Sequence, residues 1–148
     1  MGNKETKVLI FSINGGTYAT DIMEVERILG YEVPTILPDA PDFVEGVINY
    51  EGNILPVVSL SYKFNHKKNV INKDSKIIVA KQEENKLGII VDLVSEVKDV
   101  SDSSIEPPPE LVSGISERYI KGLIKIGEKI IILLNLKTIL TEAEKKLI

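Results

Sequence analysis

Apolar residues along this 148-residue chain gather in short runs, and glycine, asparagine or charged residues separate one run from the next. Short runs that are rich in β-branched residues predict β-strands rather than long helices. The first run, residues 8–13, is apolar at nearly every position, so we expect a strand that is covered on both faces. Residues 14–16 read Asn-Gly-Gly and predict a hairpin turn, after which residues 17–20 form the returning strand.

Three more hairpins are predicted, because pairs of apolar runs flank short polar or glycine-containing segments. They join residues 47–50 to 54–60, residues 77–80 to 87–91, and residues 119–126 to 129–134. Pro56 has no amide hydrogen to donate, so we expect its strand to lie at a sheet edge or to carry a bulge. Residues 94–100 continue the apolar pattern, which fits a strand or a short helix equally.

One internal segment carries a helical pattern. Residues 22–29 place apolar side chains on one helical face, and Gly30 is a suitable stop. Asp21 lies three residues before Glu24, which is the spacing of a capping box. A capping role explains this pair of carboxylates more simply than a catalytic one does. We therefore predict a short internal helix.

The chain ends in a second helical pattern. Residues 136–147 place apolar side chains on one face, and Thr141 lies three residues before Glu144, again with capping-box spacing. We predict a C-terminal helix over 136–147. Its apolar stripe favours docking on the core over binding to a partner.

One stretch of sequence occurs twice. Residues 46–60 are echoed by residues 122–136, and most aligned positions are apolar in both copies. Unrelated segments of this length would share about one identical residue. The identical pairs are Gly46 and Gly122, Ile48 and Ile124, Ile54 and Ile130, and Leu60 and Leu136.

This repeat sets the predicted domain organisation. Residues 8–28 also match residues 77–97, although more loosely. A chain of this length forms one ordinary domain or two small subdomains. We expect a single domain over 1–148, with approximate subdomains at 8–66 and 75–136 and a polar boundary between them.

Composition and charge narrow the function. The chain is 43% apolar and 27% charged, as is typical of a globular protein. Its net charge of −4 at pH 7 argues against nucleic acid as a partner, because phosphates require a basic face. The longest unbroken apolar run, residues 130–134, is far too short to cross a bilayer, so we expect no direct membrane insertion.

Residues suited to catalysis or metal binding are sparse. There is no cysteine, and the single histidine, His66, lies beside lysines, so we expect no transition-metal site, no cofactor and no catalytic site. A small β-barrel enzyme and an oligonucleotide-binding module remain alternatives from other functional classes. Clustered titratable groups in one cleft would favour the enzyme, and a basic stripe with stacking aromatic residues would favour the oligonucleotide binder.

An ordered set of motifs extends over about residues 7–139. It comprises Phe11-Ser12-Ile13 with Tyr18-Ala19, Pro38 to Asn49, Gly52 to Leu60, Gly88 to Asp92 with Val94 to Val97, Ile105 to Pro108, Tyr119 to Gly122, and Ile131 to Leu136. In this order the motifs resemble the CheW-type chemotaxis coupling proteins. The resemblance implies a mainly β fold of two SH3-like β-barrel subdomains, to which the patterns above add a short internal helix and a C-terminal helix.

The resemblance also implies a function. Members of this family are non-enzymatic adaptors that link membrane chemoreceptors to the CheA histidine kinase. One subdomain is expected to contact the regulatory domain of the kinase, which has the same fold. The helical cytoplasmic tip of the receptor is expected to lie in an apolar groove between the subdomains. The implied location is the cytoplasm, in receptor arrays beneath the inner membrane. A CheV-like coupling domain without its receiver domain is the alternative within this class.

Two departures from the family pattern affect the expected receptor contact. The usual Asn-Leu-Arg-Gly reads Asn-Tyr-Glu-Gly at residues 49–52, so Glu51 replaces an arginine. Ser59 and Ser61 stand where an aspartate and an arginine commonly flank a leucine, which would remove charge from a local surface. Either the receptor contact is rebuilt around Glu51 with a basic partner, or the chain serves a different set of receptors. Glu51 as an ordinary solvated hairpin residue is equally open.

The resemblance supplies a set of candidate partner-binding residues. Five of them match the surface hairpin of the family, and two more are expected to line the apolar groove. Glycine at turns and isoleucine in a core are ordinary structural roles, and these remain open for the hairpin residues. The hairpin candidates are Gly46, Asn49, Glu51, Gly52 and Ile54, and the groove candidates are Pro34 and Val97.

Overall fold

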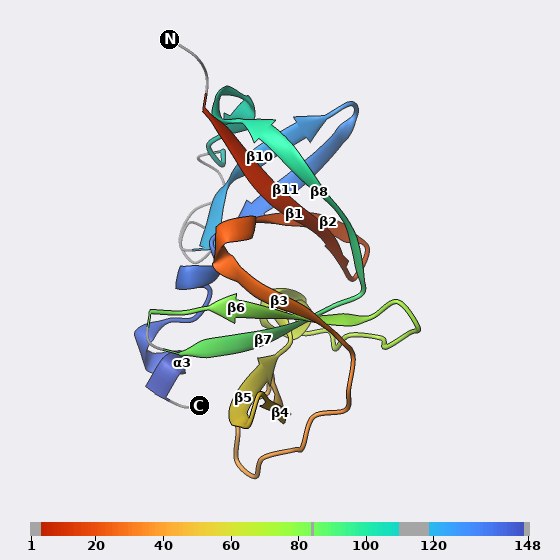
Figure 1. Cartoon of the computed structure of the whole chain (residues 1–148), viewed down its shortest axis with the longest axis vertical. Helices are drawn as coiled ribbons and strands as arrows, with labels where there is room; N and C mark the ends of the chain where they lie inside the picture. Colours follow the sequence, from red (N-terminus) through yellow and green to blue (C-terminus); the bar gives the residue numbers. More distant parts are fainter. Residues whose placement is uncertain (1–3, 84, 110–118, 147–148) are drawn as a thin grey trace.

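The computed structural model describes residues 4–83, 85–109 and 119–146, and it is mainly β (Figure 1). The strands within these ranges form two sheets, and short helices connect or follow them. Sheet A has the strand order β8-β1-β2-β11-β10-β9, and sheet B has the order β3-β6-β7-β5-β4. The prediction of a mainly β protein is confirmed.

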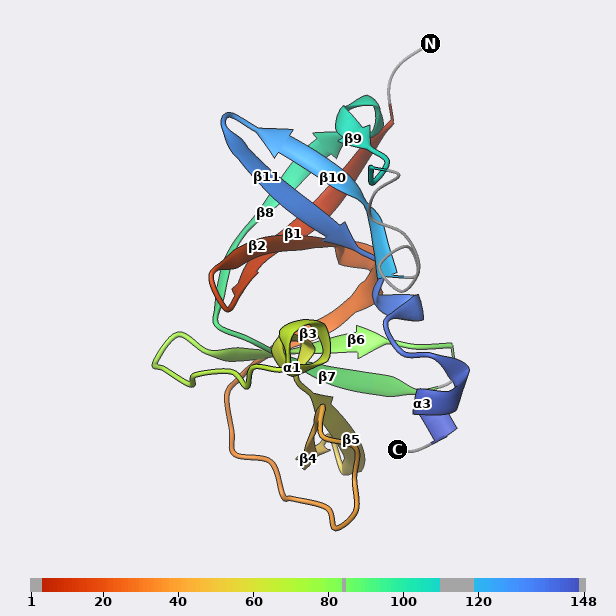
Figure 2. The same cartoon turned by 180° about the vertical axis from the view of Figure 1, so that it is seen from behind.

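The elements have the following bounds. Sheet A contains β1 (Glu5–Ile13), β2 (Gly16–Asp21), β8 (Leu93–Ser101), β9 (Ile105–Glu106), β10 (Ile120–Ile126) and β11 (Lys129–Leu134). Sheet B contains β3 (Val25–Gly30), β4 (Val44–Tyr50), β5 (Asn53–Val58), β6 (Lys76–Lys81) and β7 (Lys86–Val91). The 3₁₀ turns are η1 (Ile22–Glu24), η2 (Asp102–Ser104) and η3 (Leu136–Thr138), and the α-helices are α1 (Leu60–Asn65) and α3 (Glu142–Lys146). Figures 1 and 2 show the sheets stacked along the long axis, with α3 beside β7.

Each sheet takes strands from both halves of the chain. Strand β3 of the first repeat pairs with β6 of the second, and β8 of the second repeat pairs with β1 of the first. The parallel pairs are also equivalent, since β5 joins β7 and β11 joins β2. The predicted subdomains at 8–66 and 75–136 therefore do not coincide with the sheets. The repeat itself is present, but its first two strands lie in one sheet and its later strands lie in the other.

The two repeats fold alike in detail. The β4–β5 hairpin carries a register shift between Val44 and Gly46, and the β10–β11 hairpin carries one between Ile120 and Gly122. Such shifts admit one extra residue in one strand and bend it. Because Gly46 and Gly122 are also aligned in the sequence, the repeat preserves the position of the bend.

Among the described residues, three hydrophobic cores hold the fold together. Sheet A and sheet B each have a small core of their own, and a third core combines buried residues of both sheets. Strand β1 serves two of them, because Val8 and Ile10 face the sheet A core while Leu9, Phe11 and Ile13 face the shared core. The expected coverage of residues 8–13 on both faces is confirmed.

All four predicted hairpins form, and residues 94–100 belong to strand β8. The expectation that Pro56 marks an edge strand is wrong, because β5 lies between β7 and β4. Pro56 is tolerated because the ladder to β7 begins only at Val57, so no bond there requires the missing amide. The extra residue of the bulge lies in β4 rather than in β5.

The predicted internal helix over 22–29 is wrong beyond its first turn. Asp21 caps this turn as expected, since its Oδ1 accepts a hydrogen bond from the amide of Met23 at 2.9 Å. Glu24 does not reach back to the cap, but accepts at 3.1 Å from the amide of Lys137 in η3. From Val25 onward the chain forms β3, because pairing with β6 satisfies its backbone and suits its β-branched residues.

The predicted C-terminal helix is divided in two. The chain turns through η3, breaks at residues 139–141 and resumes as α3, while Leu147 lies outside the described residues. The predicted capping box is confirmed at the start of α3. Glu144 donates its amide to Thr141 Oγ1 at 2.9 Å, and the amide of Thr141 donates to Glu144 Oε1 at 2.8 Å.

Candidate partner-binding site

The β4–β5 hairpin turns through only two residues, Glu51 and Gly52, which have φ of 51° and 81°. Positive φ at both positions defines the type I′ turn that matches the twist of paired strands. Asn49 supports the turn, because its Oδ1 accepts from the amide of Gly52 at 3.0 Å. Asn49 and Gly52 therefore shape the turn, and Glu51 is left at its tip.

Ile54 points outward from this hairpin. Its exposed fraction is 76%, whereas that of its neighbour Leu55 is 2%. A core role for Ile54 is therefore excluded, because alternation along β5 places Leu55 inside and Ile54 outside. The hairpin presents a large apolar side chain to solvent beside its turn.

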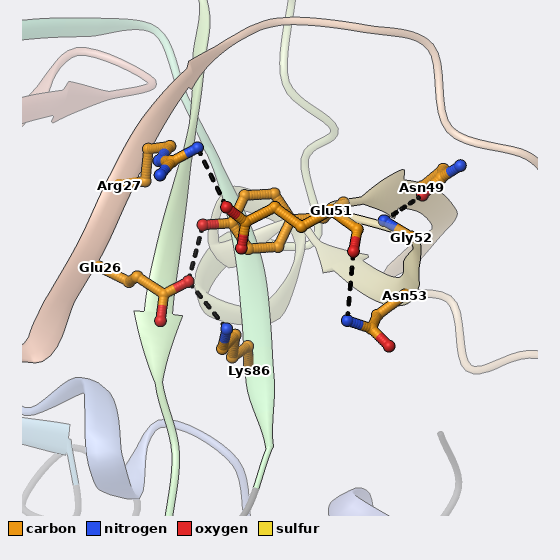
Figure 3. A network of polar contacts seen from close by, with 8 residues as sticks. Glu26, Arg27, Asn49, Glu51, Gly52, Asn53 and Lys86 are labelled. Carbon is orange, nitrogen blue, oxygen red and sulfur yellow. Dashed lines mark hydrogen bonds and ion pairs between the residues drawn. The ribbon is translucent and has the colours of Figure 1, made fainter.

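A network of polar contacts joins β3 to this hairpin (Figure 3). Arg27 Nη1 lies 3.3 Å from Glu51 Oε2, so the acid in place of the usual arginine has a basic partner within the chain. Tyr50 donates its hydroxyl to Glu26 at 2.6 Å, and Lys86 Nζ lies 2.9 Å from the same carboxylate. The guanidinium of Arg27 also lies 5.7 Å from the centre of the Tyr50 ring.

The network shifts the ionisation of two of its members. The hydrogen bond from Tyr50, together with the ammonium of Lys86, lowers the pKa of Glu26. The same hydrogen bond raises the pKa of Tyr50. Strands β3 and β4 are the two edges of sheet B, and these contacts link one edge to the hairpin of the other. The network therefore holds the hairpin in place.

Gly46 and Pro34 lie where the segment before β4 packs against the hairpin and supports it. A Cβ at Gly46, where φ is 141°, would lie 2.2 Å from the carbonyl oxygen of Thr35 and 3.0 Å from the Cβ of Pro34. Thr35 exchanges two backbone hydrogen bonds with Val47, at 2.8 and 2.9 Å. Pro34 is buried in this contact. The segment before β4 thus rests on the strand, and only glycine fits at position 46.

Val97 lies elsewhere. It is on β8 at the edge of sheet A, opposite Leu9, with an exposed fraction of 47%. Its equivalent in the first repeat is Ile28 on β3, which is 39% exposed. Pro34 is buried against sheet B, whereas Val97 lies on an exposed edge strand of sheet A. Val97 alone remains exposed enough to meet a partner.

Ser59 and Ser61 do not form a surface. Both are buried, with exposed fractions of 0% and 1%. Ser59 caps α1 by accepting from the amide of Tyr62 at 3.1 Å, and it donates to Asn69 Oδ1 at 2.6 Å. The expected loss of surface charge at these positions is therefore wrong, because both lie inside the fold.

A cavity of about 870 Å³ adjoins the hairpin. The β4–β5 hairpin, the β6–β7 turn and the C-terminal residues Leu140 and Lys145 line it. Sequence reasoning missed Arg27 and Lys86, the two basic members of the network. Arg27 was assigned to a helix, and a strand assignment for residues 25–30 would have placed it at a sheet edge.

Within the described residues, no group of three or more histidine, cysteine, aspartate or glutamate side chains could hold a metal ion. Among these residues, too, no helix is long and apolar enough to cross a membrane. The geometry is that of a surface with an apolar residue among charges.

Comparison with known proteins identifies the family. Residues 7–144 match the CheW-like domain family. The chain belongs to this family. It is 33% identical over 140 residues to the chemotaxis protein CheW of Klebsiella aerogenes, and this match covers 95% of this chain and 84% of the relative. It is 31% identical to the chemotaxis protein CheW of Thermotoga maritima, with 97% of this chain and 93% of the relative covered.

A solved structure supports the same assignment. The scaffolding protein TtCheW from Thermoanaerobacter tengcongensis superposes with a TM-score of 0.86 at 34% identity, covering 97% of this chain and 92% of that chain. The predicted fold class of two SH3-like β subdomains is confirmed, apart from the internal helix. The chain is a chemotaxis scaffold of the CheW family rather than an enzyme.

Proposed function

We propose that this protein couples membrane chemoreceptors to a CheA-type histidine kinase. It binds the regulatory domain of the kinase with one surface and the cytoplasmic tip of the receptor with another. Its place in the cell is then the cytoplasmic face of receptor arrays. Membership of the CheW-like family is the observation that carries this proposal.

The hairpin supports a role in protein binding. An exposed apolar side chain surrounded by charged and polar groups is the usual composition of a protein-binding hot spot with its rim. Ile54 supplies the apolar side chain, and the ion pair between Arg27 and Glu51 at the tip of the same hairpin supplies charged groups. The exposed Val97 on the other sheet offers a second, separate surface.

Calorimetry tests the proposal directly. The protein is titrated with the regulatory domain of the kinase from its own organism, and in a second experiment with a receptor signalling fragment. We expect saturable one-to-one binding of the kinase domain, and a ternary complex that elutes as one species when all three proteins are mixed. Absence of kinase binding at concentrations up to about 100 µM contradicts the coupling role.

The variant Ile54→Ser tests whether the β4–β5 hairpin is the surface that binds the kinase domain. Because Ile54 is exposed, the variant should unfold at the temperature of the wild type, while its affinity for the kinase domain falls about tenfold or more. Val70→Ser is the matched control, since Val70 is 79% exposed in the polar segment after α1. Equal affinities for the two variants would exclude the hairpin from the kinase contact.

A further inference from the structure

Asp92 is the single residue between β7 of sheet B and β8 of sheet A. Its backbone amide donates to the carbonyl of Ser12 at 2.8 Å, and its Oδ2 accepts from the amide of Asn14 at 2.6 Å. Ser12 lies in β1, and Asn14 lies in the turn between β1 and β2, with a φ of 47°. Asp92 therefore binds the β1–β2 turn of sheet A at the point where the chain arrives from sheet B.

A second contact joins Asp92 to the segment after α1. Asn69 Nδ2 lies 3.4 Å from Asp92 Oδ1, and Asn69 Oδ1 accepts from the hydroxyl of Ser59 at 2.6 Å. Ser59 Oγ in turn accepts from the amide of Tyr62 and so caps α1. Figures 1 and 2 show the β1–β2 turn, the start of β8 and the segment after α1 on the same side of the molecule. Side chains thus connect three segments that are far apart in the sequence.

The first repeat also has an acid where the chain crosses between the sheets. Glu24 lies between β2 and β3, and it accepts from the amide of Lys137 at 3.1 Å. Lys137 belongs to η3, which Asn135 caps as Ser59 caps α1, and these two capping residues are aligned in the sequence repeat. Each crossing is therefore joined by an acid to the segment that follows the hairpin of the other repeat.

The chemistry of the side chains fixes the direction of the hydrogen bonds around Asn69. An ionised carboxylate only accepts, so the amide nitrogen of Asn69 must face Asp92 and its oxygen must face Ser59. Position 59 must then supply a donor as well as cap the helix. A serine hydroxyl does both, whereas the aspartate that is common there in the family could only cap.

Asn69 is half-buried, whereas the other residues of the segment 66–73 are exposed. We propose that Ser59, Asn69 and Asp92 form a latch, which holds this segment at the crossing between the sheets and releases it when the contact between Asn69 and Asp92 breaks. Release leaves the sheets folded, because other side chains form the hydrophobic cores. The latch does not depend on the proposed coupling function.

Asn69→Asp removes the donor without changing the size of the side chain. Position 69 then presents a carboxylate to Asp92, so repulsion between like charges should open the latch. Thermolysin measures the opening, because it cleaves before large apolar residues such as Val70 and Ile71 and needs a locally unfolded segment. Cleavage before these residues should become about fivefold faster or more. Dividing each rate by that of the same variant in urea removes the preference of the protease for the new residue.

A second change should close the latch again. In the double variant Asn69→Asp with Asp92→Asn, the amide at position 92 can donate to the carboxylate at position 69 and still accept from the amide of Asn14. Its cleavage rate should return to within about twofold of the wild type. Asn72→Asp is the matched control, since Asn72 lies in the same segment and its side chain accepts from the amide of Asp74, as an aspartate also can.

The outcomes are distinct. A wild-type cleavage rate in Asn69→Asp overturns the inference, and so does an equal rise in the Asn72→Asp control. A raised rate that Asp92→Asn does not restore also overturns it, because contact between positions 69 and 92 would then not be the cause. Thermal unfolding shows whether each variant folds. If Asn69→Asp does not fold, recovery of folding in the double variant supports the latch, and no recovery overturns it.

Discussion

Gly46 lies on β4 where the backbone of Thr35 packs directly against the strand. Its φ of 141° and the carbonyl of Thr35 leave no room for a side chain. The sequence repeat marks this glycine as important but cannot say why, because a functional surface and a close backbone approach both conserve a glycine between repeats. The structure assigns it to the support of the hairpin.

Gly46→Ala should destabilise the protein by roughly 2 kcal/mol or more, since the new methyl group meets backbone that cannot move aside. Gly30→Ala is the control, because a Cβ at Gly30 meets nothing within 4 Å and its φ lies outside the left-handed region. Urea unfolding of the two variants measures the difference. Equal stabilities would show that the segment around Thr35 can shift.

At the scale of elements, two hydrogen bonds and an ion pair with side chains from distant parts of the chain hold the C-terminal segment in place. Glu24 accepts the amide of Lys137, and Gln82 donates to the carbonyl of Leu136 at 2.8 Å. Lys63 of α1 binds Glu144 of α3 at 2.5 Å in a pair that is mostly buried. The two carboxylates involved respond to pH in opposite directions.

Burial raises the pKa of Glu24 above its ordinary 4.5, although the amide of Lys137 and the charge of Lys121 oppose the shift. The contribution of Glu24 to stability is therefore complete below about pH 4.5 and is lost as the pH rises through the higher pKa of the folded state. Glu24→Gln can still accept the amide, so it should be as stable as the wild type or more stable at pH 7. Thermal unfolding at pH 4 and 7 measures this, and a variant less stable only at pH 7 contradicts the expectation.

Glu144 behaves in the opposite way. Burial would raise its pKa, but the hydrogen bonds from Lys63 and Thr141 outweigh burial and lower it. Its contribution is present above its ordinary pKa of 4.5 and is lost as the pH falls through the lower pKa of the folded state. Glu144→Gln should lose about 1–3 kcal/mol at neutral pH, and the loss should shrink in acid. A loss independent of pH would exclude the ion pair as its cause.

For the molecule as a whole, each repeat is divided between the two sheets, so neither repeat has a complete sheet of its own. Sheet A combines β1 and β2 of the first repeat with β8 to β11 of the second, and sheet B combines β3 to β5 of the first with β6 and β7 of the second. The two halves of the chain are therefore expected to fold only together, even though each half contains a full copy of the module.

Trypsin tests this interdependence. Lys67 and Lys68 are exposed in the segment between the repeats, so cleavage there should be early. The two fragments should then elute together from a size-exclusion column and separate only in denaturant, when both unfold. Fragments that separate in buffer and remain folded would show that each repeat is an independent domain.

The hairpins and the repeat could be predicted because turn residues and alternating polarity are local signals. The division of each repeat between two sheets could not be predicted from the sequence. The pairing of β3 with β6, for example, is decided by packing between residues far apart in the chain. Residues 22–29 satisfied a helical pattern, and tertiary pairing overrode it beyond Glu24. In the candidate site, Glu51 and Ile54 were found from the sequence, whereas Arg27 required knowledge of which strand faces the hairpin.

The shared core has a mechanical consequence. Among the described residues, its fifteen buried members come from both sheets, from α1 and from the C-terminal segment, so the two sheets pack against a common set of side chains. The two sheets therefore form one packed unit rather than two independently packed domains. Two proteins bound at opposite ends of such a unit would be held at a set distance and orientation relative to each other.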